Sequence, residues 1–112
     1  MEKQTVIAVL ASLAQETRLD VFRLLVRAGP QGLPAGSIAT TLDVPAATLS
    51  FHLKELKSCG VVDCRREGRT LSYSPNYSIM SGLISYLTEN CCTGIADCDD
   101  SAGSDKSKKK KS

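Results

Sequence analysis

The sequence predicts a mainly α-helical domain of five helices and one β-hairpin, on three observations. Apolar residues recur every three or four positions in five segments, which is the spacing of one helical face. Two of these segments are joined by the short turn Asp43-Val44-Pro45. Directly behind them, two strand-like segments flank a glycine turn. Two helices in tight succession followed by a hairpin form a winged helix-turn-helix with a two-stranded β-wing.

The first helix is apolar almost all round. One face carries Val6, Val9, Leu10 and Leu13, while Ile7 and two alanines populate the opposite face. A helix of this kind is buried, and in a chain of 112 residues a second subunit is the expected cover.

The second helix begins at Glu16-Thr17-Arg18 and ends at Gly29-Pro30. The glycine adopts the left-handed conformation that closes a helix, and proline cannot continue it. Its expected inward residues are Leu19, Phe22, Leu25 and Val26, and its expected outward residues are Arg18, Arg23 and Arg27.

The third and fourth helices form the helix-turn-helix. Pro34 suits the first turn of the third helix, and Asp43 tolerates the left-handed conformation that the connecting turn requires. The fourth helix runs from Pro45 to about Ser58, with Gly60 as its terminator. The expected core residues of the two helices are Ile38, Ala39, Leu42, Leu49, Leu53 and Leu56.

The hairpin and the last helix complete the domain. The two strands are expected at residues 61–64 and 70–73, with Gly68 as the natural positive-φ residue of the turn. Asn76 is a good N-cap for the fifth helix. The apolar face of that helix carries Met80, Leu83, Ile84 and Leu87.

Composition divides the chain into a domain over residues 1–90 and a cysteine-containing, Lys-rich flexible tail over residues 91–112. The tail is rich in small residues, aspartate and lysine, a composition typical of disorder. The formal net charge is only +2, but residues 54–69 carry five Lys/Arg against three Asp/Glu, a local basic patch suited to phosphate contact.

The sequence contains no recognisable signal peptide or membrane-spanning stretch, so we expect a cytoplasmic protein with no membrane partner. Five cysteines in a reducing compartment favour thiols or metal ligands over a disulfide framework. An enzyme is not expected, because the chain shows no paired acid and base, no Gly-rich phosphate loop and no Cys/His dyad.

Three segments of the domain resemble the ArsR/SmtB family of winged-helix metalloregulatory repressors. They are Leu13-Ala14-Gln15-Glu16-Thr17-Arg18-Leu19, then Thr48-Leu49-Ser50-Phe51-His52-Leu53, and then Arg66-Glu67-Gly68-Arg69 with Tyr73. The resemblance covers about residues 5–90. It implies a homodimer built on the first and last helices, and a repressor of a metal- or metalloid-resistance operon that dissociates from DNA on binding its inducer. The dimer residues it implies are Val6, Val9, Leu10, Leu13, Met80, Leu83, Ile84 and Leu87.

The fourth helix is the expected DNA-reading element, because the major groove admits a helix and displays distinguishable base edges. Arginines at the wing tip are placed to reach phosphate or the minor groove. The partner is then double-stranded operator DNA with two half-sites. The expected DNA contacts are Ala46, Ala47, Thr48, Ser50, Phe51, His52, Lys54, Arg65, Arg66 and Arg69.

Cys91, Cys92 and Cys98 lie just past the last helix, within eight residues. Three thiolates satisfy As(III) or Sb(III) completely, whereas Zn²⁺ prefers a fourth ligand. The three cysteines also look like the arrangement in family members that sense arsenite through C-terminal thiols. We therefore expect As(III) or Sb(III) as the inducer, with no organic cofactor. Cys59 and Cys64 are expected to pack as small apolar residues.

Three other interpretations stay open. The adjacent thiols can serve a repressor of the same fold that senses oxidants. The same site can respond to another soft ion such as Cd(II) or Pb(II). A winged helix that binds protein or buffers metal, without DNA, is the third, and the basic wing argues against it.

Overall fold

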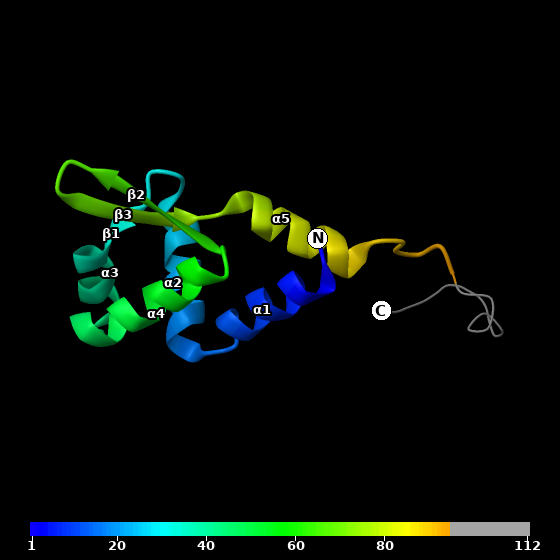
Figure 1. Ribbon diagram of the computed structural model, residues 1–112, viewed down its shortest axis with the longest axis horizontal. Helices are drawn as coiled ribbons and strands as arrows, with labels where there is room; N and C mark the ends of the chain where they lie inside the picture. The colour runs from blue at the N-terminus through cyan, green and yellow to red at the C-terminus, as the bar shows by residue number, and fades with distance from the viewer. Residues whose placement is uncertain (95–112) are drawn as a thin grey trace.

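The computed structural model describes residues 1–94 and contains five helices and a three-stranded sheet (Figure 1). The predicted mainly helical winged helix-turn-helix is confirmed. In chain order the elements are α1 (Lys3–Leu13), α2 (Glu16–Ala28), β1 (Leu33–Pro34), α3 (Ala35–Leu42), α4 (Ala46–Ser58), β2 (Val62–Glu67), β3 (Thr70–Pro75) and α5 (Tyr77–Thr88).

The helix ends follow the local chemistry that the sequence predicts. Gly29 ends α2 with φ +91°, and Asp43 closes α3 in the left-handed conformation with φ +55°. The Asn76 side chain accepts a hydrogen bond from the Ile79 amide at 3.2 Å and caps α5. These residues fix the directions in which the chain leaves one helix and enters the next.

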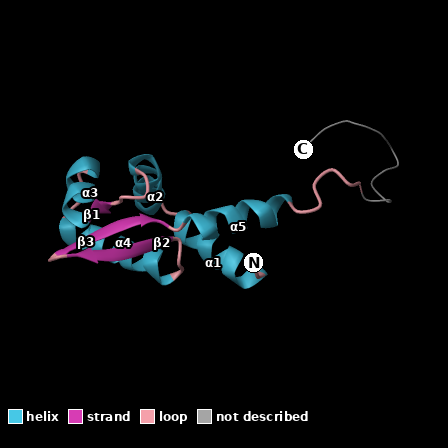
Figure 2. Ribbon diagram, turned by 90° about the horizontal axis from the view of Figure 1, so that it is seen from above, coloured by secondary structure: helices cyan, strands magenta, loops and turns pink. Residues whose placement is uncertain are grey.

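The sheet contains one strand that the sequence did not reveal. The expected hairpin is present, with β2 and β3 antiparallel around Gly68 at φ +66°. Its strands are longer than expected, because β2 continues to Glu67 and includes Arg65 and Arg66, which the sequence pattern places between the strands. The two-residue strand β1 adds to the other edge of β3, so that the order is β1-β3-β2 (Figure 2). Pro34 therefore lies in this strand and caps α3, rather than occupying the first turn of the helix.

Gly32 makes the approach of this segment to β3 possible. Its φ is +76°, and a Cβ atom added there would collide with the carbonyl oxygen of Tyr73. A side chain at position 32 thus meets both backbone strain and a steric clash with the sheet.

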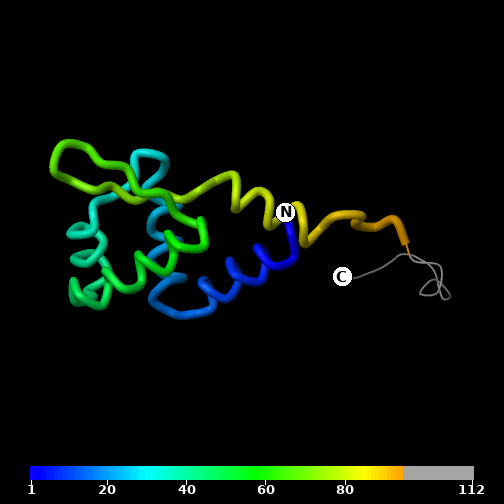
Figure 3. Tube along the Cα trace, viewed as in Figure 1, coloured from blue at the N-terminus to red at the C-terminus, as the bar shows by residue number. Residues whose placement is uncertain are grey.

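One apolar core holds all five helices to the sheet. Its fully buried members include Val9, Val21, Leu25, Ile38 and Leu56. In α2 the buried stripe is rotated from the expected one: Leu19 and Val26 are 43% and 38% exposed, and Val21 is buried instead. The chain trace shows α1 and α5 together at the end of the molecule away from the wing (Figure 3).

A polar network centred on Arg18 ties three helices together. The Arg18 Nε atom donates to the Ser12 carbonyl oxygen at 2.6 Å, and its Nη1 lies 3.2 Å from His52 Nδ1. Because a guanidinium only donates, the histidine nitrogen is the acceptor in this contact. Beside it, the Cys59 thiol donates to the Ser12 hydroxyl at 3.2 Å. Arg18, expected to point outward, instead joins the end of α1 and the start of α2 to α4.

We expect Arg18→Met to lower the free energy of unfolding by about 2 kcal/mol, because it keeps the aliphatic stem but removes charge-assisted hydrogen bonds to two helices. Urea unfolding at one fixed protein concentration measures the loss. Arg23→Met is the matched control, since Arg23 is exposed on the same helix and its side chain makes no hydrogen bond or ion pair with any of residues 1–94. Equal effects of the two variants would contradict the role of the network.

We expect Gly32→Ala to destabilise the protein by at least about 2 kcal/mol through strain and collision. Gly36→Ala should instead stabilise it by about 0.5–1 kcal/mol, because Gly36 lies in a helix with open space at its Cβ position. Thermal unfolding of the two variants checks the opposite signs. A Gly32→Ala protein as stable as the wild type would show that the loop can leave β3 without cost.

Candidate nucleic-acid interface and cysteine site

The helix-turn-helix presents α4 as a rigid, half-exposed element. The Val44 amide donates to the Ala39 carbonyl at 3.0 Å, which closes the turn between α3 and α4. On its inner side α4 buries Leu49, Leu53 and Leu56 in the core. The apolar contacts on one side fix which side chains α4 directs to solvent.

The outer side of α4 carries most of the expected DNA contacts. The exposed side chains of its first two turns are small apart from Phe51, whose side chain is 57% exposed although it is large and apolar. The structure thus brings these positions together on one continuous surface of suitable size for the major groove. The exposed expected contacts are Ala46, Ala47, Thr48, Ser50, Phe51 and Lys54.

His52 does not belong to this surface. Its side chain is only 8% exposed and is directed to Arg18 of α2. The sequence predicts that His52 contacts a base, but in this structure its ring is covered by the protomer's own residues and is not exposed to a ligand. A packing role fits better: the His52 ring meets the Phe51 ring edge-on, with centroids 5.5 Å apart.

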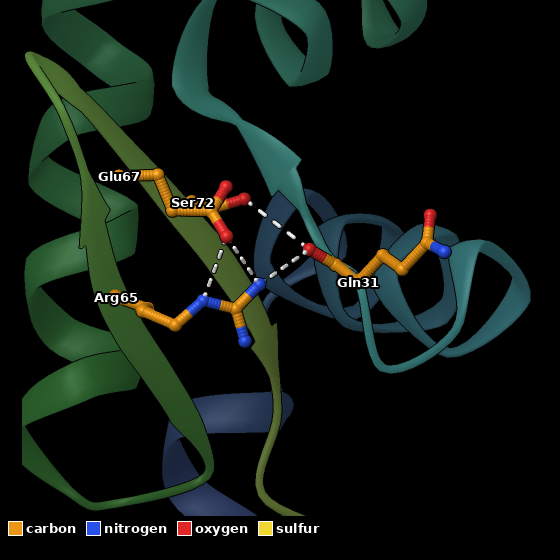
Figure 4. A network of polar contacts seen from close by, with 4 residues as sticks. All are labelled: Gln31, Arg65, Glu67 and Ser72. Carbon is orange, nitrogen blue, oxygen red and sulfur yellow. Dashed lines mark hydrogen bonds and ion pairs between the residues drawn. The ribbon is translucent and has the colours of Figure 1, made fainter.

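The three arginines of the wing differ in their contacts. Arg65, Arg66 and Arg69 are all exposed, as expected for DNA contacts. Arg65 is held by an ion pair of 2.9 Å with Glu67 and a hydrogen bond of 3.3 Å to the Gln31 carbonyl (Figure 4). Arg66 and Arg69 form no ion pair with any residue in the described part of the chain. Their charge is therefore available to an external anion.

The Gln31 carbonyl also accepts a hydrogen bond from β3 of the wing. The Ser72 hydroxyl donates to the same oxygen at 3.3 Å. On the other face of the hairpin, Cys64 lies opposite Tyr73. Burial, and after it the neighbouring Cys64 thiol, raises the pKa of the Tyr73 phenol, which therefore stays neutral at physiological pH. Tyr73 also packs against the apolar core, so both faces of the wing contact the body.

The expected dimer residues divide into two groups in the structure. Val6, Val9 and Leu83 are buried in the core of their own protomer, at 3%, 0% and 9% exposure, so they are not available to a partner. Leu13 and Met80 are partly buried against the same core. The expected positions that remain exposed are Leu10, Ile84 and Leu87.

Ile7 joins these exposed residues, although the sequence pattern puts it on the opposite helical face. It is 54% exposed, while Ile84 and Leu87 are 58% and 60% exposed. The helices α1 and α5 lie next to each other (Figures 1 and 2), and both carry large exposed apolar residues, which we call the α1–α5 face. It comprises Ile7, Leu10, Ile84 and Leu87.

Two of the three expected metal ligands lie close to the end of α5. Glu89 and Asn90 separate them from the last helical residue, and the Cys91 amide donates to the Thr88 carbonyl at 2.9 Å, which ties the pair to the helix end. Asn90 and Cys92 have positive φ. Cys91 and Cys92 are paired as a disulfide between neighbouring residues, whereas thiols or metal ligands were expected from the sequence. Cys98 lies outside the described residues. Among residues 1–94, no three His, Cys, Asp or Glu side chains gather as a metal site.

The two remaining cysteines are separate from this pair. Cys59 and Cys64 are free and half-buried, as expected for packing residues. Within the same described range, no helix combines the length and apolar character that crossing a membrane requires.

Comparisons with known proteins agree with this architecture. A family model described as a helix-turn-helix domain matches residues 13–65. The transcriptional activator HlyU of Vibrio cholerae is 30% identical over 94 residues, which cover 82% of this chain and 84% of HlyU. The cadmium resistance regulatory protein CadC of Listeria innocua is 38% identical over 61 residues, 54% of this chain and 50% of CadC.

Solved structures give the same result. An ArsR-like transcriptional regulator from Rhodococcus superimposes with a TM-score of 0.68 and 28% identity, covering 75% of this chain and 76% of that one. A homodimeric winged helix-turn-helix DNA-binding domain from Mycobacterium bovis gives 0.63 and 28%, with 75% and 76% covered. These relatives are named as transcriptional regulators rather than enzymes. The chain belongs to the ArsR/SmtB family of winged-helix transcriptional regulators.

Proposed function

We propose that this chain is a homodimeric repressor of an arsenic-resistance operon, released from its palindromic operator when As(III) or Sb(III) binds Cys91, Cys92 and Cys98. The single observation that carries the proposal is the position of the cysteine pair. Two exposed cysteines lie just past α5 and are tied to its last residue by the hydrogen bond from the Cys91 amide to Thr88, and Ile84 and Leu87 of that helix belong to the α1–α5 face. A ligand captured there acts on the helix that a second subunit would cover.

The homodimer is supported by the α1–α5 face and by the homodimeric state of the M. bovis relative. Exposed isoleucine and leucine side chains on two adjacent helices gain by burial against a copy of themselves. A symmetric dimer places two α4 helices in successive major grooves, with half-sites about 34 Å apart. The operator is then expected to be a pseudo-palindrome.

The inducer chemistry follows from the number and kind of ligands. As(OH)₃ is neutral near pH 7, and three thiols displace its three hydroxyls as three waters to give a neutral As(III) trithiolate. Cys91 and Cys92 supply two of the sulfurs and Cys98 the third. Since Cys91 is hydrogen-bonded to Thr88, closing the ring to Cys98 pulls on the last turn of α5. The left-handed backbone at Asn90 and Cys92 turns the chain sharply at this point.

A modest distortion of α5 is enough for release. Allosteric coupling typically amounts to about 1–3 kcal/mol, which lowers DNA affinity about 5- to 150-fold. Ligand-induced strain that changes how the α1–α5 faces meet alters the separation of the two α4 helices. The dimer then no longer matches half-sites at a fixed spacing.

We expect Arg66→Ala to weaken operator binding and to reduce its salt dependence, because Arg66 is an exposed wing arginine without an ion pair among residues 1–94. Removing one phosphate contact reduces the slope of log K against log salt by about 0.9, or about 1.8 for both subunits of a dimer. A salt titration by fluorescence anisotropy measures the slope, and Arg23→Ala on α2 serves as the charge-matched control. A slope equal to the wild type would exclude phosphate contact by Arg66.

We expect Cys98→Ser to bind operator normally but to lose most of its release by arsenite, since two sulfurs do not complete the three-coordinate site. The control is Cys64→Ser, which changes a wing cysteine outside the set and should keep the full response. Operator binding is measured with and without arsenite for the three proteins. Full release of Cys98→Ser would remove this residue from the mechanism.

A second candidate is a thiol-based oxidant sensor of the same fold, favoured by the contact between the Cys91 and Cys92 sulfur atoms. In that case a peroxide oxidises the pair to a disulfide and is itself reduced, with loss of two hydrogens from the protein. Mass spectrometry after mild peroxide and after arsenite separates disulfide formation from arsenic addition. Cd(II) and Pb(II) are tested beside As(III) in the same release assay, because one relative is a cadmium resistance regulator.

A further inference from the structure

We propose that α4 recognises its operator chiefly through the C5-methyl groups of thymine, with Ala47 and Phe51 as the specificity-determining residues. This inference rests on the proposed DNA-binding function and names the feature of DNA that the helix reads. It starts from the chemistry of the side chains that α4 exposes.

The first two turns of α4 lack the residues that read purines by paired hydrogen bonds. Between Ala46 and Ser58 there is no Arg, Asn or Gln, and the lysines that could contact guanine, Lys54 and Lys57, come after these two turns. Ser50 and Thr48 are exposed, but a hydroxyl both donates and accepts and so discriminates poorly between bases. Hydrogen bonding from the first two turns therefore supplies little sequence information.

The same face offers an apolar edge instead. Ala47 and Phe51 lie four residues apart, one helical turn, on the side of α4 opposite the buried Leu49, Leu53 and Leu56. Thymine is the one standard base that carries a methyl group in the major groove, and alanine and phenylalanine are side chains that contact it. We call Ala47 and Phe51 the apolar reading edge.

The Phe51 ring is supported in its exposed position. It meets the ring of His52 edge-on, and His52 is in turn held by Arg18. An exposed ring that packs edge-on against a fixed neighbour loses less freedom on binding than an unsupported one, which favours its use as a recognition element. The contact also gives His52 a part in positioning the reading edge without touching DNA itself.

The surroundings of Phe51 favour DNA over a protein partner. Ser50 precedes it, and Lys54 and Lys57 are exposed on the following turn of α4. An apolar ring beside cations matches a thymine methyl next to phosphates better than it matches an apolar protein surface. The reading edge also lies near the start of α4, at the opposite end of the molecule from the start of α1 and the end of α5 (Figure 1). A second subunit on the α1–α5 face therefore leaves it uncovered.

The test replaces thymine by deoxyuridine, which keeps every hydrogen bond and charge but lacks the methyl group. The full chain is first used to select its operator from a random-sequence duplex library. The selected duplex is then resynthesised with deoxyuridine at single half-site positions. We expect about a fourfold loss of affinity for each methyl that the edge contacts, the equivalent of about 0.8 kcal/mol.

Two variants test whether the preference for thymine over deoxyuridine comes from the apolar reading edge. In Phe51→Ala the ratio of thymine to deoxyuridine affinity should fall towards one at the contacted positions. In Lys54→Ala both duplexes should bind more weakly while the ratio is retained, because a lysine that contacts phosphate is indifferent to the methyl. Circular dichroism of Phe51→Ala checks that this exposed substitution leaves the helices intact.

The outcomes separate this inference from the proposed function. If the library yields no preferred sequence, the repressor proposal fails, and the inference fails with it. If a preferred operator emerges but every deoxyuridine duplex binds as tightly as its thymine counterpart, the repressor stands and methyl recognition is overturned. A thymine preference that survives Phe51→Ala at every position would remove Phe51 from the reading edge.

Discussion

The guanidinium of Arg18 is the group on which the arrangement of the helices depends. It binds the carbonyl at the end of α1 and the ring of His52 in α4, so these two helices are held by one side chain. Two of the three segments that resemble the ArsR/SmtB family, those containing Arg18 and His52, meet at this point. Arg18 thus links α1 to α4 directly, through hydrogen bonds to each.

Much of the fold was predictable because its boundaries are set by local chemistry. Gly29, Asp43 and Asn76 each end or begin a helix through backbone conformations or hydrogen bonds that involve neighbouring residues alone. The strand β1 was not predictable, because two residues show no alternation of polar and apolar side chains. Its existence depends on contact with β3, some forty residues away, and a single sequence does not reveal that pairing.

For the candidate site, the sequence predicted most of the exposed residues of α4, but it predicted only in part which apolar and polar residues are buried. Periodicity places Ala47, Phe51 and their neighbours on the outer side of α4, where the structure has them. It cannot separate the protomer core from a face covered by a partner, since Val9 and Leu10 are equally apolar and only one is buried. The burial of His52 escapes prediction because its partner, Arg18, is far away in sequence. The complete cysteine site stays a prediction, as Cys98 lies outside the described residues.

The attachment of the wing has a consequence for variation among related chains. Arg65 and Ser72 both donate to the backbone carbonyl of residue 31, and the side chain of Gln31 takes no part in this contact. Every amino acid carries that carbonyl, so position 31 is free to change without loosening the hairpin. Natural or designed sequences can therefore vary residue 31, between the fixed glycines of this loop, while the angle of the wing stays the same.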